Sequence, residues 1–246
     1  MNNKKWYIYL FVLFVIMIKN NGYSQPTQVE HNFNTWWSNN NKYHLSNKWY
    51  FSSELHIRRT KGLQKWQQFL FRPAVNYALN KTIVATIGYT FIQSYPYGEH
   101  PTSTIIPEHN SWEQITLKHR MNKIKFSHRF RFEQRFIGVD EQNNENLNHF
   151  KYVQRVRYRF TSQFPLMKKG KLFGKCFDEI WINQANNLMP LSLNQNWLYL
   201  GVGYKISSKV NVECGVMDQV IRKNNVDHYE SNPTLQFSVG LIFGKD

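Results

Sequence analysis

Long apolar runs and cysteine are both scarce in this sequence of 246 residues. Beyond Ser24, no apolar stretch approaches the roughly 20 residues that a membrane-spanning helix needs. No segment repeats its apolar residues with the 3.6-residue period of an amphipathic helix. Cys176 and Cys214 fall on segments that we do not expect to be neighbours, so we expect two unpaired thiols, with a disulfide as the alternative. Strands are therefore the expected elements of this chain.

The sequence also lacks the local motifs of most enzymes. It has no nucleophile elbow, no histidine cluster with metal-ligand spacing and no glycine-rich phosphate loop. Ser127 and His128 are neighbours on a strand and point to opposite faces, so they cannot form a catalytic dyad. His109 and Ser111 share a face, but only Glu113 could orient them. We therefore predict no catalytic residue, no metal site and no cofactor.

The N-terminus has the pattern of an export signal. Lys4 and Lys5 precede an apolar run at residues 6–18, and small residues follow at 22–24. The run of about 13 residues is too short for a comfortable transmembrane helix, which makes a retained anchor the weaker alternative. We predict a cleavable signal peptide over residues 1–24 and one domain over residues 25–246.

Acidic residues are few, with 16 Asp and Glu against 31 Lys and Arg, a net charge of +15. Loss of Lys4, Lys5 and Lys19 with the signal lowers this charge to +12. Such an excess attracts nucleic acid, anionic lipid surfaces or small anions. Because the chain is predicted to be exported, we expect no nucleic-acid partner.

Residues 123–160 show the clearest pattern in the chain, two strands joined by a polar loop. Successive side chains on a strand point to opposite faces. One face carries Ile124, Phe126, Phe130, Phe132, Phe136, Phe150, Tyr152, Val156, Tyr158 and Phe160. The other carries Lys125, Arg129, Arg131, Glu133, Arg135, Lys151, Arg155, Arg157 and Arg159. An aromatic face opposite a cationic face fits either of two classes of protein. In a soluble sheet the aromatic face points inward, and in a membrane barrel it points outward.

The rest of the chain favours the membrane barrel. Most alternating segments reach the 9 to 11 residues that a membrane strand needs. Short turns alternate with longer polar loops, and the polar faces hold the Arg, Glu, Gln, Asn, Thr and Gly expected of a lumen. Tyr, Trp and Phe gather near strand ends, as they do at membrane interfaces. We therefore predict an all-β, transmembrane, antiparallel up-and-down β-barrel, because only a closed sheet leaves no unpaired backbone in lipid.

The strand count follows from topology. Eleven segments are clear when residues 29–46 are taken as one strand, and a break at 39–41 gives twelve. If the tight turns and both chain ends are periplasmic, the number of strands is even. We therefore predict about twelve strands, with ten as the alternative.

Several short motifs resemble an uncharacterised bacterial family of predicted outer-membrane barrels, known only as a domain of unknown function. The resemblance rests on Trp37, the run Tyr43-His44-Leu45-Ser46-Asn47-Lys48-Trp49, Glu54, Arg58, Phe71-Arg72-Pro73, Tyr77, Gly88-Tyr89, the run from Arg129 to Arg135, and Arg155-Val156-Arg157-Tyr158. It spans nearly the whole chain after residue 24. It implies fold and location, and brings no activity with it.

The predicted lumen concentrates charge. If the loop between the two strands of residues 123–160 is centred near Asn143, Arg131 lies opposite Arg155 and Arg129 opposite Arg157. Like charges directly opposed destabilise a sheet, so carboxylates must lie across the lumen. The predicted charge network comprises Arg129, Arg131, Glu133, Arg135, Arg155, Arg157, Arg159, Glu54, Arg58, Arg72, Glu179 and Glu213.

Two interpretations of this network remain open. Either glutamates match the arginines and the network rigidifies a nearly filled barrel, or unmatched charge attracts anions, as in pores lined by Arg or Lys. We expect a monomer in the bacterial outer membrane whose partners are membrane lipids and small anionic solutes. Its role is structural or that of a narrow, anion-leaning conduit. The alternatives are an outer-membrane lipase or acyltransferase, and a soluble exported β-barrel that binds an apolar ligand.

Overall fold

The computed structural model describes residues 28–98, 102, 104–139, 149–167, 170–184, 191–222 and 228–244. The predicted signal peptide therefore lies outside the described residues. The strands are β1 (Gln28–His31), β2 (Asn34–His44), β3 (Trp49–Thr60), β4 (Lys65–Ala78), β5 (Ile83–Ser94), β6 (Ile106–Met121), β7 (Ile124–Gly138), β8 (Phe150–Pro165), β9 (Leu172–Gln184), β10 (Leu191–Lys205), β11 (Val210–Arg222) and β12 (His228–Gly244), with a 3-10 turn, η1 (Lys61–Leu63), after β3. No helix among these residues is long and apolar enough to cross a membrane.

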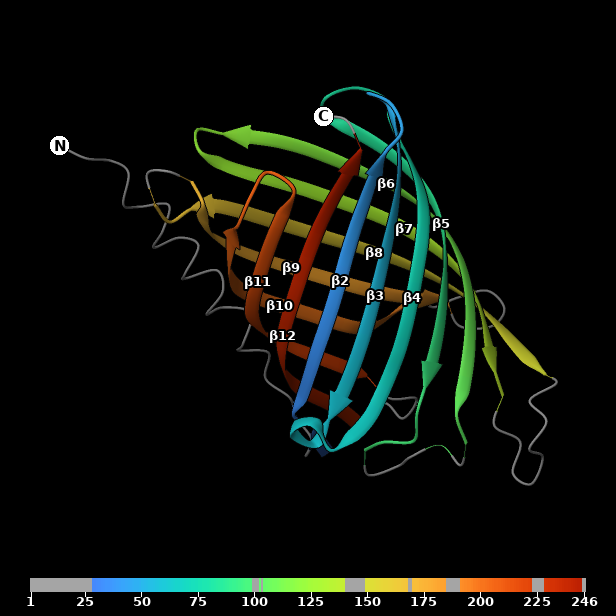
Figure 1. Ribbon diagram of the computed structural model, residues 1–246. Coiled ribbons are helices and arrows are strands. Elements are labelled where there is room, and N and C mark those ends of the chain that lie inside the picture. The colour runs from blue at the N-terminus through green and yellow to red at the C-terminus, as the bar shows by residue number, and fades with distance from the viewer. Residues whose placement is uncertain are drawn as a thin grey trace.

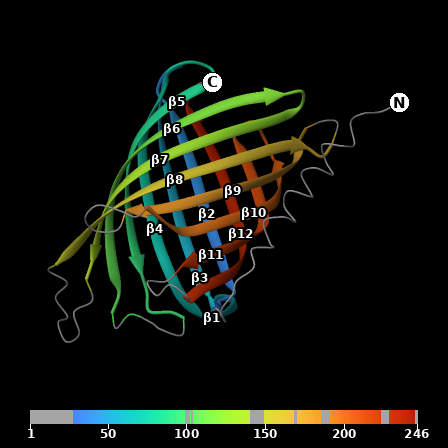
Figure 2. The ribbon, with the colours of Figure 1, turned by 180° about the vertical axis from the view of Figure 1, so that it is seen from behind.

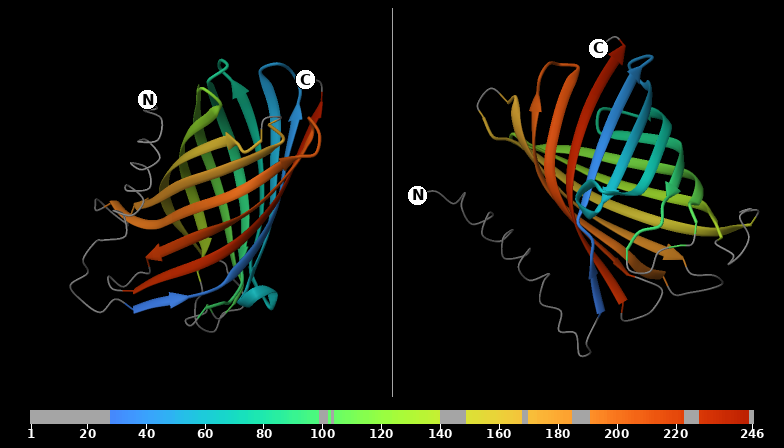
Figure 3. Two further views of the ribbon diagram at one scale, coloured as in Figure 1. Left: turned by 90° about the vertical axis from the view of Figure 1, so that its left-hand side faces the viewer. Right: turned by 60° about the horizontal axis from the view of Figure 1, so that its bottom comes forward.

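The strands β2 to β12 form one closed barrel (Figure 1). Each strand from β2 onward pairs antiparallel with the next, and β12 pairs with β2 to close the sheet. The view from behind shows the same continuous wall (Figure 2). The side view shows that the strands are tilted relative to the barrel axis (Figure 3). The prediction of an all-β up-and-down barrel is confirmed.

The closing pair differs from the predicted topology. Strands β2 and β12 run parallel, with Asn34 opposite Thr234 and His44 opposite Gly244. The described residues form twelve strands, as predicted, but only eleven of them make the closed wall, so the even number predicted for the barrel itself is wrong. Strand β1 continues the line of β2 along β12 in the same register. The break in this segment falls at residues 32–33, and the predicted break at 39–41 lies inside β2.

The two ends of the barrel differ. At one end, which we call the turn end, four connections leave four or fewer residues between strands: 45–48, 79–82, 122–123 and 206–209. The connection at 166–171 is the longer one there, as the sequence predicts. The opposite loop end carries η1 and the connections around 95–105 and 139–149. Gly244 lies at the turn end, near the C-terminal end marked in Figure 1, and the pairing of Gln28 with His228 places Gln28 at the loop end.

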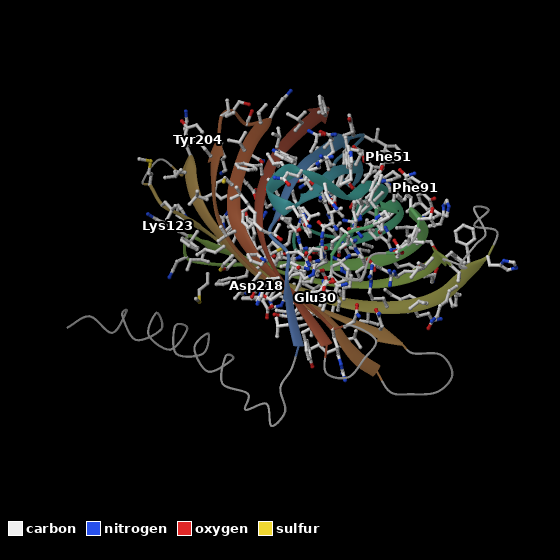
Figure 4. All side chains as sticks on the ribbon, turned by 90° about the horizontal axis from the view of Figure 1, so that it is seen from below. Glu30, Phe51, Phe91, Lys123, Tyr204 and Asp218 are labelled. Atoms are coloured by element: carbon white, nitrogen blue, oxygen red, sulfur yellow. The ribbon has the colours of Figure 1, made fainter. Side chains whose placement is uncertain are left out.

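The two faces of the wall confirm the orientation inferred from residues 123–160. Phe130 is 47% exposed on the outside, whereas Arg157 is 2% exposed on the inside. Phe51 and Tyr204 project outward, and side chains crowd the interior (Figure 4). A wall that is apolar outside and charged inside is the arrangement of a membrane barrel, and the reverse of a soluble one.

Aromatic contacts on the outer face occur toward both ends of the barrel, and Phe130–Tyr158 and Trp37–Phe237 lie between them. Toward the turn end, the ring pairs are Tyr43–Phe243, Trp49–Tyr77, Phe126–Phe160 and His119–Phe126. Toward the loop end, they are Trp66–Tyr95, His109–Phe150 and Phe136–Tyr152. Paired aromatic belts mark the two water interfaces of membrane barrels, so their positions support the predicted girdles.

A second aromatic group fills part of the interior, which the sequence did not predict. It comprises the aromatic residues Trp36, Phe177, Trp181, Trp197 and Tyr199 together with Met217, all buried. Tyr199 stacks on Phe177 with ring centroids 4.8 Å apart. This group covers one side of the lumen, and the arginines of β7 and β8 cover another.

Candidate functional site

The β7–β8 register brings a glutamate between the arginines. Arg131 lies opposite Arg157, Arg129 opposite Arg159, and Glu133 opposite Arg155. The predicted register, with Arg131 opposite Arg155, is wrong by two residues. A shift of two leaves every side chain on its predicted face, because the strand period is two.

Two carboxylates organise the centre of the lumen. Glu133 is fully buried and pairs with Arg155 at 2.5 Å, with Arg157 at 2.8 Å and with Arg131 at 3.6 Å. It lies on β7 between the arginines of that strand and of β8. A single carboxylate therefore serves three guanidinium groups.

Glu179 of β9 repeats this arrangement two strands further along the wall, on the other side of β8. It is also fully buried, and it pairs with Arg129 at 2.5 Å, with Arg157 at 2.8 Å and with Arg159. Arg157 bridges the two carboxylates, donating to Glu133 through Nη1 and to Glu179 through Nε. We call these seven residues the central network: Arg129, Arg131, Glu133, Arg155, Arg157, Arg159 and Glu179.

The central network has five cations and two carboxylates, and aromatic rings stabilise the excess. The Arg157 guanidinium lies 3.5 Å from the centroid of Trp181, and that of Arg131 lies 3.8 Å from Trp112. Arg159 lies over Phe177 at 4.1 Å. Ring faces attract cations, more strongly when both are shielded from water. The interior tryptophans therefore act as electrostatic partners of the arginines as well as packing groups.

The other predicted network residues form separate pairs around this centre. Arg135 pairs with Glu108 through two hydrogen bonds of 2.6 and 2.8 Å. Arg72 pairs with Glu54 at 2.6 Å. Glu213 pairs with Lys175 at 2.7 Å, outside the arginine network to which the sequence assigned it.

Sequence reasoning missed Glu108, the partner of Arg135, although a signal for it existed. The β6–β7 turn leaves only two residues between the strands, so their register can be counted from the sequence. That count places Asn110 opposite Arg135 and Glu108 diagonally beside it. Diagonal neighbours on one face are within reach of long side chains.

A cavity of about 520 Å³ lies inside the lumen. Its wall includes Lys42, near the turn end, and Tyr97, in the connection after β5 at the loop end. The described wall carries seven arginines and two lysines against three glutamates. With Arg131, Glu133 and Glu179, which are buried beside it, ten cations face five carboxylates. The lumen is therefore partly open and its wall is positively charged.

Further cations gather where the lumen reaches the turn end. Lys42 lies within electrostatic reach of Lys118 and Lys175, and Lys125 within reach of Arg120 and Lys205. The loop end instead holds two carboxylates opposite each other, Glu30 on β1 and Glu230 on β12. These described side chains therefore place cations at the turn end and carboxylates at the loop end.

Arg58 is the cavity arginine that forms no ion pair with a carboxylate of the described residues. Its Nη1 donates to Gln68 at 2.6 Å, and its guanidinium lies 3.9 Å from the centroid of Trp36. Tyr97 lines the cavity nearby, and burial, with the Glu230 charge, raises the pKa of Tyr97 to about 12. The phenol is therefore neutral at pH 7 and does not balance Arg58.

The structure keeps the one candidate enzymatic pair apart. Ser111 donates its hydroxyl hydrogen to Gln134 at 2.9 Å, and His109 is hydrogen-bonded to the Tyr89 hydroxyl at 2.5 Å. Both lie on the outer face of β6, within the aromatic and polar surface toward the loop end. Among the described residues, no group of three or more His, Cys, Asp or Glu could hold a metal ion. Cys176 and Cys214 are unpaired, on strands separated by β10.

The chain resembles several known proteins in sequence or in fold. An uncharacterised protein of Methylorubrum extorquens is 24% identical over 70% of this chain and 72% of its own length. Two forms of OmpT, an outer membrane protein of Vibrio cholerae, match the fold. The loop L8 deletion mutant has a TM-score of 0.39 and 13% identity over 72% of this chain, and the in-vitro folded form has 0.38 and 14% over 77%. The chain spans a little over half the length of these barrels, 55% and 57%. Residues 33–230 match a family described as a protein of unknown function, and the chain therefore belongs to that family, DUF2490.

Proposed function

We propose that this barrel lies in a bacterial outer membrane and is a narrow conduit that favours small anions. The observation that carries the proposal is the positively charged cavity, whose described wall has nine cations and three carboxylates. Fixed Arg and Lys charges along a lumen lower the energy of an anion there and raise that of a cation. The central network holds these charges in place.

The orientation follows from the connections. Outer-membrane barrels keep short turns on the periplasmic side and long loops outside. The turn end, with Lys42, Lys118 and Lys125, would then face the periplasm. Anions entering there meet the more positive end of the lumen first.

The first test measures ion selectivity. Purified protein in planar bilayers under a KCl gradient is expected to show a small conductance. Its reversal potential is expected to lie nearer the equilibrium potential of chloride than that of potassium. Lys42→Glu introduces a negative charge at the cavity wall and is expected to reduce the chloride-to-potassium permeability ratio several-fold. Lys42 forms no ion pair among the described residues, so this change spares the central network.

The matched control is Lys48→Glu, which makes the same change in the tight turn 45–48, away from the cavity wall. It is expected to leave the reversal potential unchanged. Silent bilayers, or a reversal potential that neither favours chloride nor responds to Lys42→Glu, would contradict the proposal.

A further inference from the structure

We propose that Arg58 is a binding site for an oxyanion, the carboxylate or phosphate group of a small solute inside the lumen. This inference rests on the proposed function, because the solute reaches Arg58 through the cavity. It goes further in naming the chemical class that the lumen holds and the residue that holds it.

Only some of the nitrogens of the Arg58 guanidinium donate hydrogen bonds within the part of the chain that the structure describes. Nη1 donates to Gln68, and the guanidinium lies 3.9 Å from the ring centroid of Trp36 and 5.6 Å from that of Trp197. Nε is buried and has no hydrogen-bond partner among the described residues. Nε and Nη2 form the edge of arginine that binds two anionic oxygens side by side. Neither nitrogen of that edge makes a hydrogen bond to a described residue.

The surroundings favour an anion at this edge. Arg58 is 7% exposed, and the charges of Arg72 and Arg157 act on it unfavourably, while Glu54 acts on it favourably without forming an ion pair with it. A buried cation without an ion-pair partner lowers the stability of the fold. A buried donor without an acceptor is commonly satisfied by a water molecule or an ion. A bound oxyanion would supply the missing charge and the missing acceptor together.

Chloride fits the site less well than an oxyanion. A carboxylate or phosphate presents two oxygens at the spacing of the Nε and Nη2 hydrogens, and a spherical ion cannot satisfy both in line. The cavity of about 520 Å³ admits a small solute and excludes a polymer. We therefore expect saturable binding of oxyanions above any response to chloride.

The experiment titrates the detergent-solubilised protein with inorganic phosphate or succinate, against KCl at equal ionic strength. Trp36 lies against Arg58, so the readout is tryptophan fluorescence, which needs no ion flow. A saturable change in fluorescence is expected with one or both oxyanions. The oxyanion that binds more tightly identifies the class of solute as phosphate or carboxylate. Arg58→Gln is expected to weaken this binding at least tenfold. Arg58→Lys keeps the charge without the planar fork and is also expected to weaken it.

The matched control is Arg59→Gln, one residue along the chain on the outer face, where the guanidinium lies over Trp66. It is expected to bind as the unchanged protein does. Far-ultraviolet circular dichroism of each variant checks that the barrel has folded. If Arg58→Gln does not fold, the test is made with Arg58→Lys. Oxyanion responses no larger than that of KCl, or binding unchanged in a folded Arg58 variant, would overturn the proposal. Binding without conductance would instead overturn the conduit and leave the site standing.

Discussion

Replacing Glu179 with glutamine is expected to lower the free energy of unfolding by about 3–5 kcal/mol. The carboxylate is fully buried and is shared by Arg129, Arg157 and Arg159. Glutamine keeps the shape and removes the charge, which leaves Arg129 and Arg159 without a carboxylate partner, while Arg157 keeps Glu133. Breaking a buried pair in this way costs more than the pair contributes on balance, because the remaining charges stay desolvated. Equilibrium denaturant unfolding of the refolded barrel, followed by tryptophan fluorescence, measures the loss.

Glu113→Gln provides the matched control. Glu113 lies on the outer face of β6, exposed and without a hydrogen bond or ion pair to another described residue. A carboxylate on the lipid-facing side is itself unfavourable, so its removal is expected to cost no stability. Equal unfolding midpoints for the Glu179 variant, the control and the unchanged protein would show that the central network does not hold the barrel together.

Gly88→Ala is expected to destabilise the barrel by about 1–3 kcal/mol through overpacking. A Cβ at Gly88 would lie 2.1 Å from the Trp112 ring. That ring is 2% exposed, donates Nε1–H to Thr90 at 2.9 Å and lies under the Arg131 guanidinium. The indole can therefore make room only by giving up these contacts. The same unfolding measurement reports the cost.

Two comparisons separate this effect from a general intolerance of side chains in β5. In a Trp112→Leu background, Gly88→Ala is expected to cost much less, because the clashing ring is gone. Gly240→Ala meets only the flexible amide of Asn211, which can move, and is expected to cost little. If the two glycine variants lose the same stability, close packing of Trp112 on the wall is not the cause.

The faces of the strands could be predicted from sequence because they depend only on the period of two. Phe130 and Arg131 are neighbours in the chain, and the alternation alone assigns one to the outside and the other to the lumen. Pairing register is a different matter. The long connection around 139–149 gives no count from which to fix it, so the opposition of Glu133 and Arg155 could not be derived.

The interior tryptophans show a second limit of the sequence. Alternation places Trp36 on the same face as Asn34, which is the lumen face, yet tryptophan is common at membrane interfaces. Inside the lumen, Trp36 contacts Trp197 of β10, a strand far along the chain, with ring centroids 5.3 Å apart. Such contacts depend on which strands are neighbours and on how far the wall shears, which no local pattern records.

The parallel seam between β12 and β2 has a consequence for where the chain leaves the wall. With eleven strands, Gln28 and Gly244 sit at opposite rims. A short epitope fused ahead of Gln28 and another fused behind Gly244 would therefore be carried on opposite sides of a bilayer. An antibody added to intact cells would reach only one of them.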